Sequence, residues 1–207
     1  ENGGARRLIV KGAPEEILKL SSRYETADGA EHPLDDAARA AITATFDALS
    51  AEGQRCLGLA SRTVPADHQS AVTTDETDLI FAGFAVFLDP PKASAGETMR
   101  ALAAAGVTVK VLTGDNQQVA RHLFNALGLP ITGALNGDEL AQLSDEALLG
   151  RLANVNLFCR VNPQQKLRVI LAMKRVGHVV GYLGDGINDA PSLHAADIGI
   201  SVDDAAD

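Results

Sequence analysis

Cysteine is scarce in this sequence, and long apolar runs are absent. Its two cysteines, Cys56 and Cys159, lie 103 positions apart, with no second Cys or His at the spacing of a zinc site. This excludes a disulfide scaffold and a zinc ribbon, and is typical of a reducing, cytosolic setting. The longest apolar run, Leu79 to Leu88, has 10 residues, about half of the ~20 that a membrane-spanning helix needs. No membrane span is therefore predicted.

Positive charge is also in deficit, because 18 Lys and Arg stand against 27 Asp and Glu, giving a net charge of −9. This balance disfavours a nucleic-acid partner. With 46% hydrophobic and 22% charged residues, the composition is that of a globular protein and excludes intrinsic disorder. The chain opens on Glu1 without an initiator Met or signal peptide and stops at Asp207 just after an apolar stretch, so we expect a piece of a longer protein.

The first 78 residues predict a small α+β domain. A β-branched run at 8–10 predicts a strand, and Pro14 with two acidic neighbours predicts the first turn of a helix. A second helix is expected from Asp35 to Gly53, followed by a strand over 55–60. Because the polar stretch 63–78 has no periodicity, we expect a loop and a domain boundary there, with domains over 1–78 and 79–207.

From Leu79 onward, strand-like and helical runs alternate, which predicts a mostly parallel sheet with helices on both faces. Ser94 and Glu97 form a capping-box pattern, and Asn162 followed by Pro163 predicts another helix start. The predicted strands are 79–88, 107–112, 155–159, 178–183 and 197–202, and the predicted helices are 94–105, 116–127 and 162–176.

Polar residues suited to phosphate and Mg²⁺ follow two of these strands. Thr113-Gly114-Asp115 comes after one, and Gly184-Asp185-Gly186-Ile187-Asn188-Asp189 comes after another. Ligands gather at the carboxyl ends of strands in open α/β sheets, and Mg²⁺ binds one or two carboxylates together with substrate phosphate. Lys166, near a helix N-terminus, adds a positive charge for an anion.

Each of these features also has an ordinary structural interpretation. Thr113-Gly114-Asp115 could be a turn with a helix cap, and Lys166 could be a solvated helix lysine. Their occurrence together in one α/β domain favours a functional site. The sequence contains no Gly-x-x-x-x-Gly-Lys loop, no Gly-x-Gly-x-x-Gly fingerprint and no Gly-x-Ser-x-Gly elbow.

Four segments together resemble the signature set of P-type cation-transporting ATPases and occur in that family's order. They are KGAPE at 11–15, DPPK at 89–92, TGD at 113–115 and GDGINDAP at 184–191. The residues that flank these motifs are most similar to those of the bacterial magnesium-transporting branch of the family. The resemblance covers nearly the whole chain and implies a haloacid-dehalogenase-like fold for the second domain, after the carboxyl part of a nucleotide-binding domain.

The resemblance implies roles for the matching residues of the second domain. Asp185 would be a Mg²⁺ ligand, with Asn188 and Asp189 around it. The transferring phosphoryl group would be bound by Thr113 and Gly114 and neutralised by Lys166, and Asp115 would help at the nucleotide end. These roles are physically reasonable because phosphoryl transfer depends mainly on positioning and charge stabilisation.

In the first domain, Lys11 and Gly12 would line an ATP pocket and Arg55 would contact phosphate. Asp89, Pro90, Pro91 and Lys92 are expected to form a hinge between the domains, since two prolines make a stiff connection.

Parts of the family's machinery do not occur in the sequence. It has no Asp-Lys-Thr-Gly-Thr motif, whose aspartate is phosphorylated, no Thr-Gly-Glu-Ser motif and no membrane helix. We therefore expect this piece to be inactive alone and to bind nucleotide weakly. It would be soluble itself, and in its parent would lie on the cytoplasmic side of the cell membrane.

The expected partners are ATP and the transmembrane and actuator domains of the same polypeptide. The transported cation would be reached only through the membrane helices, and the sequence around the motifs indicates that this cation is magnesium. Two alternatives stay open. One is a soluble haloacid-dehalogenase-type phosphatase, and the other is a non-catalytic module that senses Mg²⁺ or nucleotide.

Overall fold

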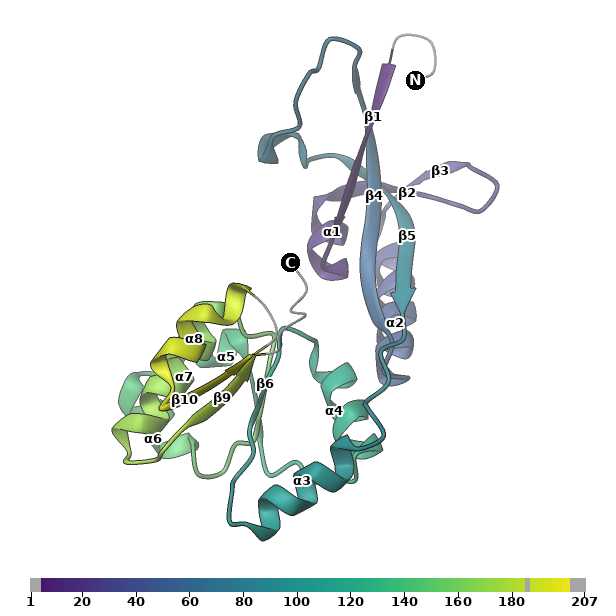
Figure 1. Ribbon diagram of the computed structural model, residues 1–207. Coiled ribbons are helices and arrows are strands. Elements are labelled where there is room, and N and C mark those ends of the chain that lie inside the picture. The colour runs from purple at the N-terminus through teal and green to yellow at the C-terminus, as the bar shows by residue number, and fades with distance from the viewer. Residues whose placement is uncertain (1–4, 185–186, 202–207) are drawn as a thin grey trace. The chain divides into compact units, whose positions relative to one another are not determined.

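The computed structural model describes residues 5–184 and 187–201, and the chain divides into two compact units, 1–89 and 90–207. The first unit contains a five-stranded sheet in the order β1-β4-β5-β2-β3 (Figure 1). Only β2 and β5 pair in parallel; the other neighbours are antiparallel. The strands are β1 (Ala5–Gly12), β2 (Ser21–Glu25), β3 (Glu31–Pro33), β4 (Arg55–Pro65) and β5 (Leu79–Phe87).

Local signals explain the helices of this unit. Helix α1 (Pro14–Leu20) has Pro in its first turn, as predicted. Helix α2 (Asp36–Ala51) begins where the Asp35 carboxylate accepts a 2.8 Å hydrogen bond from the Ala38 N–H, and it ends before Gly53, whose φ of 81° closes the helix. A short 3₁₀ turn, η1 (Thr73–Asp75), lies in the loop after β4.

Helix α1 packs on one face of the sheet, and Gly58 makes the close approach possible. A Cβ added at Gly58 would lie 3.0 Å from Ile17 Cβ and 3.1 Å from Pro14 Cα. A larger residue at 58 would therefore push against the helix at this point. The buried residues of this core are Val10, Ile17, Leu18, Leu34, Ala60, Leu79 and Phe81.

The boundary predicted after residue 78 differs from the division in the structure, which falls after Asp89. Strand β5 lies between β4 and β2 in the first sheet and does not open the second one. The reason is pairing: Leu79 to Phe81 are buried, and Ile80 and Phe81 pair with β2 on one side and with β4 on the other. The polar stretch 63–78 thus ends one strand and connects it to its antiparallel neighbour.

The second unit contains parallel strands flanked by helices. One sheet has the order β6-β8-β7 and a parallel pair joins β9 and β10. The strands are β6 (Val111–Leu112), β7 (Ala134–Asn136), β8 (Leu157–Cys159), β9 (Gly181–Gly184) and β10 (Ile198–Ser201). The helices are α3 (Ala95–Ala104), α4 (Gln117–Ala126), α5 (Gly137–Gln142), α6 (Asp145–Arg151), α7 (Pro163–Arg175), the 3₁₀ turn η2 (Ile187–Asp189) and α8 (Ala190–Ala195).

Helices cover both faces of the sheet around β8. Leu157 and Cys159 pack with Phe124 of α4, whereas Phe158 points the other way and packs with Val169 of α7. Helix α7 also carries Ile170, which packs with Val180 and Tyr182 beside the β9–β10 pair. It therefore joins the two parallel sheets of the unit.

Two predictions for this unit need correction. Ser94 precedes α3, but its side chain makes no capping hydrogen bond and its backbone is already helical, with φ −78° and ψ −13°, so the predicted capping box is absent. The strand predicted over 107–112 is confined to Val111 and Leu112, since only these residues pair with β8. Among the described helices, none has the length and apolar character needed to cross a membrane.

Candidate functional site

The segments that follow β6 and β8 are hydrogen-bonded to each other at the carboxyl edge of the parallel sheet. The Thr113 N–H donates to the Phe158 carbonyl at 2.9 Å, and the Val161 N–H donates to the Thr113 carbonyl at 3.1 Å. The Arg160 N–H donates to the Asp115 carbonyl at 2.9 Å. These bonds fix the backbone of the Thr113–Asp115 turn against the turn that leads into α7.

The Thr113–Asp115 turn is also held by its own side chains. The Thr113 hydroxyl accepts from the Asp115 N–H at 3.0 Å and donates to Asp115 Oδ2 at 3.1 Å. Gly114 is exposed, and a Cβ added to it would meet nothing within 4 Å. Its peptide is therefore open to solvent on that side and can approach a ligand.

Lys166 is positioned by the start of α7. Asn162 and Gln165 form a reciprocal capping box, with Pro163 in the first turn, as the Asn162-Pro163 pattern predicts. Lys166 Nζ donates to Asp189 Oδ1 at 2.8 Å, and the two side chains are only 16% and 10% exposed. The structure thus brings together two residues that were predicted as site residues from distant parts of the sequence.

Gly184 lies in close contact with the Asp189 side chain. A Cβ added to Gly184 would lie 2.8 Å from Asp189 Cβ and 3.0 Å from Asp189 Oδ2, so the missing side chain makes room for this carboxylate beside the end of β9. Asn188 is exposed in the same turn. Asp185, the predicted Mg²⁺ ligand, lies outside the described residues, and among those that are described no three His, Cys, Asp or Glu cluster as a metal site.

In the first unit, Lys11 and Arg55 lie on the same face of the sheet. Lys11 pairs with Leu59, and Arg55 is four residues from Leu59 on β4, so both side chains point to the face opposite α1. Gly12 ends β1 opposite Gly58. Arg55 Nη1 forms an ion pair with Asp89 Oδ2 at 3.0 Å, and both side chains are exposed, at 50% and 65%.

The predicted hinge begins at this ion pair. The chain divides between Asp89 and Pro90, and Pro90, Pro91 and Lys92 are all exposed. The Lys92 carbonyl then accepts from the Ala95 N–H at 2.9 Å, at the start of α3.

Cysteine chemistry does not contribute to this edge. Cys159 ends β8 and is buried, and burial raises the pKa of its thiol to about 11. A thiol with that pKa stays protonated near neutral pH and is a poor nucleophile. Burial also raises the pKa of the half-buried Cys56 thiol. Both cysteines lie in strands, Cys56 in β4 and Cys159 in β8, and behave as small hydrophobic side chains.

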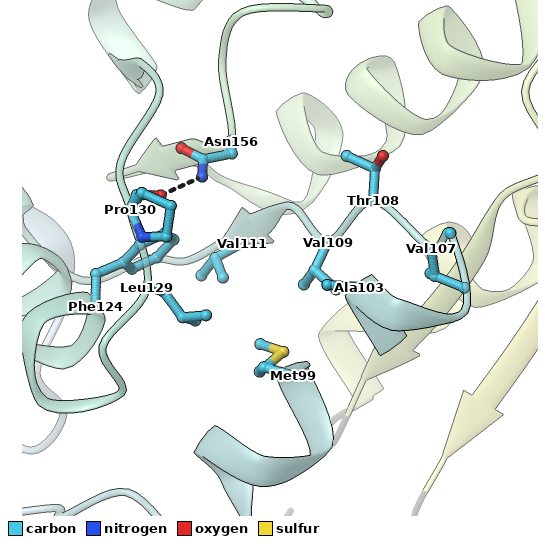
Figure 2. A pocket seen from close by; sticks show the side chains of 11 residues that line it. Met99, Ala103, Val107, Thr108, Val109, Val111, Phe124, Leu129, Pro130 and Asn156 are labelled. Atoms are coloured by element: carbon cyan, nitrogen blue, oxygen red, sulfur yellow. Dashed lines mark hydrogen bonds between the residues drawn. The ribbon is translucent and has the colours of Figure 1, made fainter. Parts of the chain in front are cut away.

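A pocket of about 350 Å³ in the second unit is not part of the candidate site (Figure 2). Met99, Val109, Val111 and Leu129 line it with other apolar side chains. Asn156 at its rim is satisfied, since its Nδ2 donates to the Pro130 carbonyl at 2.9 Å. None of the predicted site residues lines this pocket.

Sequence reasoning missed two residues at the carboxyl edge. Arg160 has a left-handed backbone with φ 53°, and Gly137 begins α5 against its carbonyl group. The only sequence signal was the Asn136-Gly137 dipeptide, which is typical of turns. No pattern indicated that this turn contacts the segment after β8.

Comparison with known proteins gives a consistent result. Residues 1–94 match the family described as "P-type ATPase, cytoplasmic domain N". The chain is 42% identical over all of its 207 residues to "Magnesium-transporting ATPase, P-type 1" of Salmonella typhimurium and, equally, of Escherichia coli K12. The chain is therefore similar to P-type cation-transporting ATPases over its full 207 residues.

More distant P-type ATPases also match. "Calcium-transporting ATPase 1" of Saccharomyces cerevisiae is 35% identical over 201 residues, which is 94% of this chain. The chain spans only 23% of the length of the magnesium-transporting relatives and 21% of the yeast protein. The resemblance to P-type ATPases inferred from the four sequence motifs is confirmed.

Proposed function

We propose that this chain supplies the phosphoryl-transfer residues and part of the nucleotide site of an ATP-driven cation transporter, with magnesium as the transported ion. The observation that carries the proposal is the buried Lys166–Asp189 pair, 2.8 Å apart, at the carboxyl edge of a parallel sheet. A buried ion pair is costly to desolvate and adds little stability over apolar packing. A functional demand for both charges at this place accounts for its presence.

In this proposal, the second unit binds the transferring phosphoryl group. The Thr113 hydroxyl, which would turn its hydrogen from Asp115 Oδ2 to the ligand, and the open Gly114 peptide bind its oxygens, while the Lys166 ammonium neutralises charge that develops in the transition state. Asp115 holds the Thr113 hydroxyl by hydrogen bonds and would lie toward the nucleotide part of the bound ATP. Asn188 orients groups in the loop before α8. The nucleophile would be the carboxylate of an aspartate outside these residues. It attacks the γ-phosphorus of ATP and ADP leaves, and water then hydrolyses the aspartyl phosphate, which releases inorganic phosphate and restores the carboxylate.

Asp185 and Asp189 would hold Mg²⁺. The room that Gly184 leaves for the Asp189 carboxylate, together with the hard oxygen donors, fits this ion. When bound, Mg²⁺ polarises the phosphoryl oxygens as a Lewis acid. The protein's own contribution is to hold Asp189 in place through Lys166.

The first unit would belong to a nucleotide-binding domain and the second to a phosphorylation domain with a haloacid-dehalogenase-like fold. Lys11, Gly12 and Arg55 would bind ATP on the open face of the first sheet, where two cations suit a polyphosphate. Residues 89–92 would be the hinge. The parent protein would be a membrane protein, with this part on its cytoplasmic side and with transmembrane and actuator domains as partners.

The test is a pair of matched substitutions in the full-length protein, Lys166→Arg and Lys174→Arg. Each lysine lies on α7 and pairs with an aspartate, Asp189 or Asp197. Arginine keeps the charge but replaces a compact ammonium by a planar fork. We expect Lys166→Arg to lower ATP-dependent phosphoenzyme formation at least tenfold and Lys174→Arg to leave it unchanged.

Wild-type phosphorylation in Lys166→Arg would contradict the proposal. The two alternatives give other results in the same assays. A phosphatase would hydrolyse small phosphate monoesters without a need for ATP, and a sensing module would form no phosphoenzyme at all.

A further inference from the structure

The turn between β7 and α5 contacts the backbone of the turn between β8 and α7, which contains Arg160 (the Arg160 turn). Gly137 is the point of contact. A Cβ added to Gly137 would lie 2.2 Å from the Arg160 carbonyl oxygen and 3.0 Å from Gln165 Oε1. The first of these contacts is with backbone, which cannot rotate away as a flexible side chain would. Any larger residue at 137 must therefore displace the Arg160 turn.

Gly137 is also hydrogen-bonded to the start of α7. Gln165 Nε2 donates to the Gly137 carbonyl at 2.7 Å, while Gln165 Oε1 accepts from the Asn162 N–H at 3.0 Å. One glutamine side chain thus completes the cap of α7 and ties it to the β7–α5 turn. Lys166 is the next residue along this helix.

The Arg160 turn transmits this contact to the other side of the site. Its carbonyl faces Gly137, while its N–H donates to the Asp115 carbonyl and the Val161 N–H donates to the Thr113 carbonyl. The Arg160 backbone, at φ 53°, occupies a region with little freedom for a side-chain-bearing residue. A shift at Arg160 therefore moves the Thr113–Asp115 turn and the start of α7 together.

We propose that Gly137 is a positioning residue for phosphoryl transfer. Its bare Cα lets the β7–α5 turn hold the Arg160 turn and the α7 cap at close range, which aligns Thr113 and Lys166 with each other. This inference rests on the proposed function of the same site. It assigns to Gly137 no contact with substrate.

The test compares three Gly→Ala variants of the full-length protein. Gly133, before the opposite end of β7, makes a similar clash, since its added Cβ would lie 2.4 Å from the Asn154 carbonyl oxygen. Gly150 in α6 has nothing within 4 Å of an added Cβ. Gly133→Ala therefore controls for steric damage away from the carboxyl edge, and Gly150→Ala controls for the substitution itself.

We expect Gly137→Ala to lower kcat about 100-fold, as a displacement of about 1 Å at a reacting centre can do. The KM for ATP should stay within about twofold, because Lys11 and Arg55 lie in the other unit. Gly133→Ala should lower the melting temperature by about as much as Gly137→Ala does, but it should keep kcat within about threefold of wild type. Gly150→Ala should change neither the melting temperature nor kcat.

A Gln165→Leu variant covers the case in which Gly137→Ala does not fold. It removes the hydrogen bond to the Gly137 carbonyl without a clash, and we expect a smaller fall in kcat, about five- to tenfold, again with unchanged KM. Wild-type kcat in both variants would overturn the inference, as would an equal loss of kcat in Gly133→Ala.

These outcomes are distinct from failure of the proposed function. That failure appears as wild-type phosphorylation in Lys166→Arg. Loss of phosphorylation in Lys166→Arg, combined with wild-type kcat in Gly137→Ala and Gln165→Leu, overturns the positioning role alone.

Discussion

The two units hold their charged site residues in opposite ways. In the second unit, Lys166 and Asp189 are mostly buried and bound to each other, whereas Arg55 and Asp89 in the first unit form an ion pair that is at least half exposed. Both are ion pairs between a basic side chain and an aspartate. The pair at the sheet edge is held in place by burial, whereas the pair on the open sheet face is exposed to solvent and can exchange partners. Under the proposed function, this difference would suit alignment of reacting groups at the first place and uptake and release of a nucleotide at the second.

The close-packed glycines repeat this contrast. Gly58 makes room for α1 on the face of the first sheet that is opposite Lys11 and Arg55. Gly137 makes room beside the candidate site itself. Steric constraint therefore supports the scaffold in one unit and the site in the other.

The largest effect on stability should come from breaking the buried pair. Lys166→Met leaves the Asp189 carboxylate buried without its partner, and we expect unfolding of the second unit to become easier by about 3–5 kcal/mol. Asp89→Asn removes an exposed pair and should cost at most about 1 kcal/mol in the first unit. Denaturant unfolding of both variants measures the two values, and equal losses would refute the contrast.

A smaller loss is expected from crowding beneath α1. Gly58→Ala pushes a methyl group against Pro14 and Ile17, which should cost about 1–3 kcal/mol. Nucleotide affinity should be unchanged, because Lys11 and Arg55 point to the other face. Gly12→Ala is the matched control: an added Cβ there lies at an ordinary 3.5 Å from Ile17 Cδ1, so the melting temperature should hardly move. A fall in ATP affinity in Gly58→Ala would show that the two faces are coupled.

Two buried serines should respond with opposite sign. Within the described part of the chain, Ser192 Oγ in the second unit has no hydrogen-bond partner, so Ser192→Ala should raise stability by about 1 kcal/mol. In the first unit, Ser61 Oγ accepts from Arg7 Nε at 2.9 Å, and Ser61→Ala should lower stability by about 1 kcal/mol. Thermal unfolding of each variant provides the measurement, and a loss in Ser192→Ala would indicate a partner for that hydroxyl.

The smallest effects concern acid sensitivity. Hydrogen bonds from the Val180 N–H, then from Lys174, lower the pKa of Asp197 below its ordinary 3.8. The Val72 N–H, with a smaller contribution from His68, lowers the pKa of Asp75. A lowered folded-state pKa stabilises the protein above 3.8, and the stabilisation is lost as pH falls through the folded-state value.

Asp197→Asn should therefore flatten the pH dependence of melting in the second unit between about pH 5 and pH 2, and Asp75→Asn should do so in the first. Melting curves across this range test both. Unchanged pH profiles in the two variants would assign the acid sensitivity to other carboxylates.

Local signals in the sequence predicted five of the described helices, α1 to α4 and α7, and missed the short helices α5, α6 and α8. The Asn162-Pro163 start of α7 and the Asp35 cap of α2 are confirmed because a cap depends on residues within one turn. The Ser94 prediction is wrong because the backbone of Ser94 is itself helical and its side chain makes no capping hydrogen bond. Short strands such as β3 and β7 have only three residues, too few for periodicity to indicate them.

Non-local contacts were beyond sequence patterns. The apolar run at the start of β5 fits the middle of either sheet, and only its pairing with β4 and β2 assigns it to the first unit. The motifs predicted that Lys166 and Asp189 matter, but their separation of 23 residues hides the ion pair. The contact of Gly137 with Arg160 is between two backbone segments that are distant in the sequence, and a pattern of side chains cannot predict it.

Helix α7 has a consequence for the order in which the second unit is assembled. During synthesis, β6, β7, β8 and α7 emerge before β9 and β10, so the side of α7 that includes Val169 can be covered while Ile170 still lacks Val180 and Tyr182. An isolated two-stranded sheet is only marginally stable in water. The β9–β10 pair thus depends on packing against α7, and the Lys166–Asp189 contact can form only after the segment that follows β9 has emerged.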